Sequence, residues 1–167
     1  MFKLKSSIVM AGTLLALGSG MVVAAEPADT QAQLDAIKAT IPKFAVPMRE
    51  VGDRFQNMHF AAHGGNWALA AYMSKYMNAS MNPAKLTKAA EYKVWARFYE
   101  EKFAPVNAAI QAKDLKKFDA AYKAVIGDCN GCHKESEYGF IRVVPLKAPP
   151  DQGIDYHVAS NPGDVPK

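Results

Sequence analysis

The chain has two cysteines, and both lie in the five-residue run Cys129-Asn130-Gly131-Cys132-His133. Two thiols with this spacing, followed directly by a histidine, form the C-x-x-C-H pattern of covalent haem attachment. One turn of helix separates the thiols, so each can add to a vinyl group of one porphyrin, and the next residue can bind the iron. The pattern predicts one haem c held by Cys129 and Cys132, with His133 as the proximal iron ligand.

Other uses of a C-x-x-C pair fit this sequence less well. A structural zinc site would need two more cysteine or histidine ligands, and the remaining histidines, His59, His63 and His157, have no suitable spacing. A thioredoxin-like dithiol belongs to a βαβ unit, of which the sequence shows no sign. A disulfide between cysteines so close in sequence would stabilise little, because the loop that it closes is very short.

The start of the chain has the pattern of an export signal. Residues 1–5 are short and basic, residues 8–24 are apolar, and residues 23–25 are small, as a cleavage site requires. The apolar run is short and interrupted by glycine, which favours a signal peptide over a retained membrane anchor. We therefore expect a signal peptide over residues 1–25 and a periplasmic mature chain, which agrees with haem c attachment outside the cytoplasmic membrane of bacteria.

Helical periodicity dominates the mature chain. A short amphipathic segment, 29–40, comes first, and apolar residues then recur at three- and four-residue steps in four segments, 44–62, 67–80, 88–110 and 115–132. In the last segment one stripe contains both thiols and four apolar side chains, Leu115, Phe118, Tyr122 and Val125. The pattern predicts an all-α domain over residues 26–138, built as an antiparallel four-helix bundle with the haem in the core near the end of the last helix.

Several residues mark the expected helix boundaries. Gly64 and Gly65 should end the first long helix, and Asn66 should cap the next. Asp114 should cap the helix that carries the cysteines. Pro105 lies inside a helical pattern and should kink or break that helix.

With these features the chain resembles the class II c-type cytochromes, the cytochrome c-prime group and its low-spin relatives. The shared features are an exported all-helical chain, a single C-x-x-C-H on the last helix, and a first helix facing the far side of the haem. The resemblance covers roughly residues 44–138 and implies that Cys129 and Cys132 form the thioethers and that His133 is the proximal ligand. The family usually ends soon after its motif, whereas 34 residues follow His133 here.

Those additional residues are expected to form an extended, proline-rich tail over residues 139–167. Alternating apolar residues in its first half favour a strap packed on the bundle, and its prolines exclude a continuous helix. The last fifteen residues are expected to be loosely ordered, with His157 on the surface. Lys134 and Arg142 could pair with haem propionates, but ordinary solvent-facing charges explain them equally well.

The sixth position of the iron has several candidates. Met58 lies on the core stripe of the first long helix, and it follows Arg54 by four residues, as a ligating methionine does in the low-spin relatives. Met58 could equally be a plain core residue. His59 or His63 would give bis-histidine coordination, and Phe55 over an open iron would suit a five-coordinate haem.

Two function classes follow from one haem and no visible catalytic constellation. The first is an electron carrier, and the alternative is a five-coordinate protein that binds a small gas such as nitric oxide; no enzymatic activity is expected. Without Lys3 and Lys5 the 20 basic residues fall to 18, against 16 acidic ones, a balance too weak to indicate nucleic-acid binding. We expect redox proteins as partners, no membrane association after signal cleavage, and a homodimer as a further option.

Overall fold

A computed structural model describes residues 27–166, and within that range the chain is all-helical. The elements are α1 (Pro27–Thr40), α2 (Ala45–Gly64), α3 (Trp67–Ser80), α4 (Ala84–Thr87), α5 (Ala89–Ala112), α6 (Leu115–Glu135) and the 3-10 helix η1 (Pro162–Asp164). This confirms the predicted all-α class. The predicted signal peptide lies outside the described residues.

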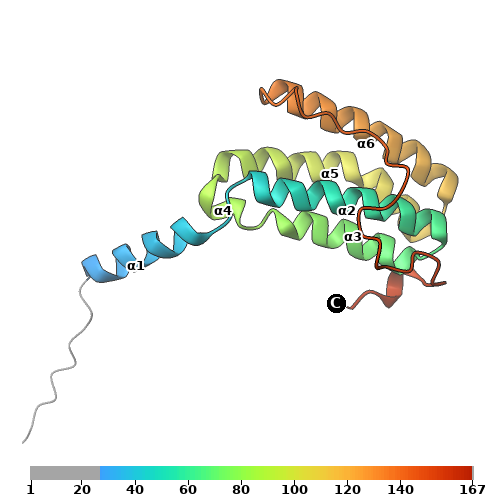
Figure 1. The fold of residues 1–167 in the computed structure, drawn as a ribbon, viewed down its shortest axis with the longest axis horizontal. Coiled ribbons are helices and arrows are strands. Elements are labelled where there is room, and N and C mark those ends of the chain that lie inside the picture. Colours follow the sequence, from blue (N-terminus) through green and yellow to red (C-terminus); the bar gives the residue numbers. More distant parts are fainter. Residues whose placement is uncertain (1–26, 167) are drawn as a thin grey trace, which may run out of the picture.

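The long helices α2, α3, α5 and α6 form a helical bundle. Helix α2 packs on α3, α3 on α5, and α5 on α6, while α6 also contacts α2. Figure 1 shows α2, α3 and α5 lying lengthwise beside one another, with α6 along one side and α1 projecting away from the bundle. Within the described range no helix is both long enough and apolar enough to cross a lipid bilayer.

The predicted helix boundaries are confirmed where the chain turns. Gly65 has a φ of +80° directly after α2, a conformation that glycine adopts without strain. The side chain of Asn66 accepts a hydrogen bond from the Leu69 N–H (3.1 Å) at the start of α3. Asp114 accepts one from the Lys117 N–H (3.0 Å) at the start of α6, so both predicted caps are present.

Pro105 does not break its helix. Helix α5 runs without interruption from Ala89 to Ala112, with Pro105 inside it. Both Pro105 and Glu101, whose carbonyl loses its usual N–H partner, are exposed. Water can satisfy that carbonyl, which lowers the cost of the proline and allows the helix to continue.

Aromatic side chains join the helices across the core. Phe55 of α2 stacks on Tyr122 of α6, with ring centroids 4.2 Å apart. The same Phe55 meets the ring of Phe103 of α5 edge-on at 5.9 Å. These contacts hold α2, α5 and α6 in one relative position, on which the geometry of the site depends.

The tail contacts the bundle at several points, some of them within its last fifteen residues, which were expected to be loosely ordered. Tyr156 is buried, and its hydroxyl donates to Asn57 Oδ1 (2.6 Å). Ser160 Oγ donates to Asn66 Oδ1 (2.7 Å), and Lys75 Nζ donates to the Pro166 carbonyl (2.9 Å). Buried amides such as those of Asn57 and Asn66 require hydrogen-bond partners, and the tail supplies them. In Figure 1 the tail follows α6 and then crosses the bundle.

Candidate haem attachment site

The C-x-x-C-H motif occupies the last turns of α6, and its two cysteines are half-buried and not joined by a disulfide. Cys129 packs against the hydrophobic core. Cys132 lines a cleft of about 300 Å³ between α5 and α6, whose walls also include Arg97 and Lys102. Cys129 therefore lies on the core side of α6, as predicted. Cys132 lies at the edge of the bundle.

The environment of Cys129 suits a neutral sulfur. Burial raises the pKa of the Cys129 thiol to about 12, with smaller contributions from Cys132 and Asp128. Thiolates that bind zinc or attack disulfides need the opposite shift, since the reactive form is the anion. A thioether carries no charge and can be buried at little cost, so this position fits haem attachment better than metal-thiolate or dithiol chemistry.

The imidazole of His133 is oriented by the tail. Its Nδ1 lies 2.9 Å from the carbonyl oxygen of Ile141. A carbonyl can only accept, so Nδ1 carries the hydrogen and donates, which leaves the lone pair of Nε2 for a metal. A histidine held in this way by a backbone carbonyl is the usual arrangement of a metal ligand.

Asn130, inside the motif, holds the tail beside His133. Its Nδ2 donates to the Val143 carbonyl (3.0 Å), and its Oδ1 accepts from the Val143 N–H (2.8 Å). Val143 lies two residues after Ile141, so this pair of hydrogen bonds fixes the strap next to the histidine. Sequence reasoning did not single out Asn130, because an amide between two cysteines carries no signal of its distant partner.

The contacts between α2 and α6 set which residues face each other. His63 Nε2 lies 2.7 Å from Asp119 Oδ1, and the rings of His59 and Phe55 stack on Tyr122 with centroids 4.8 and 4.2 Å away. Residues later in α6 therefore contact residues earlier in α2. His133 is eleven residues beyond Tyr122, about 16 Å along a helix axis.

That distance separates the predicted sixth ligands from the motif. Two ligand atoms on opposite sides of one metal are about 4 Å apart, twice a metal–nitrogen bond of about 2 Å. Phe55 and His59 both contact Tyr122, and Met58 lies between them along α2, so its backbone is at the same level of the bundle. The structure therefore does not bring Met58, His59 or His63 to His133.

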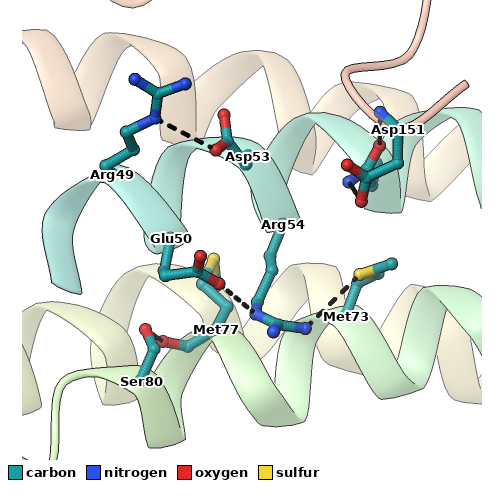
Figure 2. A network of polar contacts seen from close by, with 9 residues as sticks. Arg49, Glu50, Asp53, Arg54, Met73, Met77, Ser80 and Asp151 are labelled. Carbon is teal, nitrogen blue, oxygen red and sulfur yellow. Dashed lines mark hydrogen bonds and ion pairs between the residues drawn. The ribbon is translucent and has the colours of Figure 1, made fainter. Parts of the chain in front are cut away.

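The environment of Met58 also differs from the one expected for a distal ligand. Met58 is fully buried. Arg54, one turn earlier on α2, reaches toward α3, with Nη1 4.0 Å from Met73 Sδ (Figure 2). Arg54 Nε lies 3.2 Å from the Glu50 carboxylate, a charge contact without hydrogen-bond geometry. Met58 is thus a core residue, and Arg54 contacts Glu50 and Met73.

The cations expected near haem propionates are on the surface. Lys134 and Arg142 are both exposed. The cleft beside Cys132 contains two other cations, Arg97 and Lys102, of which Lys102 lies 3.4 Å from Asp128. No family model, curated protein or solved structure matches the chain.

Proposed function

We propose that the protein is an exported monohaem c-type cytochrome of the class II kind that carries electrons between redox proteins. In this proposal the described helices form an antiparallel four-helix bundle, haem c is attached to Cys129 and Cys132, and His133 binds the iron. The observation that carries the proposal is the Nδ1–H of His133 on the Ile141 carbonyl. That hydrogen bond leaves Nε2 of His133 available, and the two cysteines of the motif form no disulfide.

The bound haem would supply a one-electron iron centre. The chain itself supplies the thiols, the oriented imidazole and an apolar surrounding that includes Val125, one turn before Cys129 on the same face of α6. Exclusion of water from such a surrounding keeps the reorganisation on electron transfer small. This supports electron transfer as the function.

For the sixth position the helix register favours Met48 over Met58. Extended from the His59–Tyr122 contact at the same rise per residue on both helices, the register would put Met48 level with His133. Met48 is half-buried and packs against the core. A thioether opposite an imidazole gives a six-coordinate, low-spin haem with a raised potential, which suits an electron carrier.

Covalent attachment is tested by extraction with acidified acetone. The mature chain, produced together with haem-maturation machinery, should keep its colour in the protein fraction. Replacement of both thiols, Cys129→Ser with Cys132→Ser, should remove it, because no thioether can form. His157→Ala changes an exposed histidine far from the motif and should leave the colour unchanged.

Release of the wild-type haem into the organic phase would overturn the attachment. The optical spectrum of the same sample separates the two function classes. A low-spin spectrum supports the electron carrier, and a high-spin, five-coordinate spectrum would replace it with the gas-binding alternative.

A further inference from the structure

Three potential metal ligands meet between α2 and α6, away from the C-x-x-C-H motif. A ring nitrogen of His59, a ring nitrogen of His63 and a carboxylate oxygen of Asp119 all lie within 4.8 Å of one another. The histidines are four residues apart on α2, so they share one face of the helix. Asp119 comes from α6, so the cluster joins two elements that are distant in sequence.

The hydrogen bonds within this cluster leave one strong polar group unsatisfied. His63 Nε2 and Asp119 Oδ1 are 2.7 Å apart. His59 Nδ1 is buried and has no hydrogen-bond partner. Buried ring nitrogens almost always have a partner, so a His59 ring that lacks one and lies beside two other potential ligands indicates room for a bound group.

The surroundings hold the cluster in place and leave it accessible. The ring of His59 lies against Tyr122, with centroids 4.8 Å apart, and against Phe118 at 6.5 Å. The side chains of His63 and Asp119 are 41% and 46% exposed, which leaves a route for an ion and for water. One side of the cluster is thus packed on aromatic rings, and the other is open to solvent.

The cluster is separate from the haem attachment site. Asp119 precedes Cys129 by ten residues and His133 by fourteen, about 15 and 21 Å along α6. A ligand bound at the cluster therefore does not compete with an iron held by His133.

We propose that His59, His63 and Asp119 bind one divalent late transition-metal ion, such as Zn²⁺ or Cu²⁺, with water in the fourth position. Imidazole and carboxylate donors are the ligand types that these ions accept. In a tetrahedral site with bonds of about 2.0–2.2 Å the donor atoms lie about 3.4 Å apart. Small rotations of the three side chains bring their donor atoms from the present distances, all within 4.8 Å, to that spacing.

The test is Zn²⁺ titration of the untagged, haem-loaded protein by isothermal calorimetry. In that form the thiols and His133 are occupied, so they cannot compete for zinc. We expect one ion per chain. The substitutions His63→Gln and Asp119→Asn change half-exposed residues, and each should weaken binding at least about tenfold.

A matched control is His157→Gln, which removes an exposed histidine outside the cluster and should leave the affinity unchanged. Because the ligands come from α2 and α6, Zn²⁺ should also raise the unfolding temperature of the wild type and not of Asp119→Asn. Absence of binding at millimolar Zn²⁺, or equal binding by wild type and both variants, would overturn the site. If haem is absent from the purified protein, titration of the Cys129→Ser, Cys132→Ser form tests the cluster independently of the proposed function.

Discussion

At the scale of single residues, two methionines on the same helix have different surroundings. Met58 is fully buried among core side chains, and Met48 is half-buried nearer the start of α2. Both belong to the apolar stripe that repeats at three- and four-residue steps. The proposal distinguishes them by the register of α2 against α6: extended from the His59–Tyr122 contact, it puts Met48 level with His133.

The two methionines can be separated by substitution. Met48→Ala should open the iron, lower the midpoint potential and allow rapid carbon monoxide binding, because the thioether that raises the potential is lost. Met58→Ala should keep the wild-type spectrum but lower the free energy of unfolding by about 2–5 kcal/mol, the usual cost of truncating a large core residue. Optical spectra with and without carbon monoxide report the iron coordination, potentiometry gives the midpoint potential, and urea unfolding gives the free energy of unfolding. A Met58→Ala variant that folds and becomes high-spin would restore Met58 as the ligand.

At the scale of elements, the strap and α6 are joined by hydrogen bonds around His133. Asn130 binds both backbone groups of Val143, and the adjacent Ile141 carbonyl accepts from His133. A hydrogen bond from the ligand's N–H makes the imidazole a stronger electron donor to a bound metal. The strap therefore contributes to the electronic properties of the site as well as to its packing.

This coupling predicts a change of potential from a residue that touches no haem ligand atom. Asn130→Ala should free the strap, weaken the His133–Ile141 hydrogen bond and raise the midpoint potential. The free energy of unfolding should fall by about 1–3 kcal/mol, because two part-buried backbone groups lose their partner. Asn161→Ala removes an exposed partner of Lys113 in the same tail and serves as the control. An unchanged potential in a folded Asn130→Ala variant would contradict the positioning role.

At the scale of the whole molecule, the tail packs against the end of α2. Gly64 is the last residue of α2, and a Cβ there would collide with the backbone carbonyl of Tyr156. The tail can approach this closely only because the side chain is absent. The buried Tyr156 and its hydrogen bond to Asn57 depend on that approach.

Two glycines of the same helix test this arrangement. Gly64→Ala should lower the free energy of unfolding by about 1–3 kcal/mol, since the new methyl group overpacks the contact with the tail. Gly52→Ala adds the same group where nothing lies within 4 Å, and should raise stability by up to about 1 kcal/mol through helix propensity. Chemical denaturation of both variants measures the difference. Equal effects of the two substitutions would show that the tail does not pack at Gly64.

Local structure could be predicted from the sequence. The caps Asn66 and Asp114 and the turn at Gly65 depend on neighbours within a few residues, so the sequence alone predicted them. The helical class follows from periodicity in the same way. The helix does not break at Pro105, because the cost of a proline depends on whether water reaches the freed carbonyl, which is a property of the folded surface.

The tertiary structure decided everything that depends on distant partners. A stripe with helical period identifies the face of α2 that is buried, and it carries no information on how far α2 is shifted along α6. That shift separates Met48 from Met58, and it brings His59 and His63 to Asp119. The position of the tail also depends on distant partners, because Asn57 and Asn66 bind residues 99 and 94 positions later in the chain. Such pairings arise when the whole chain packs, and no periodic pattern in the sequence indicates them.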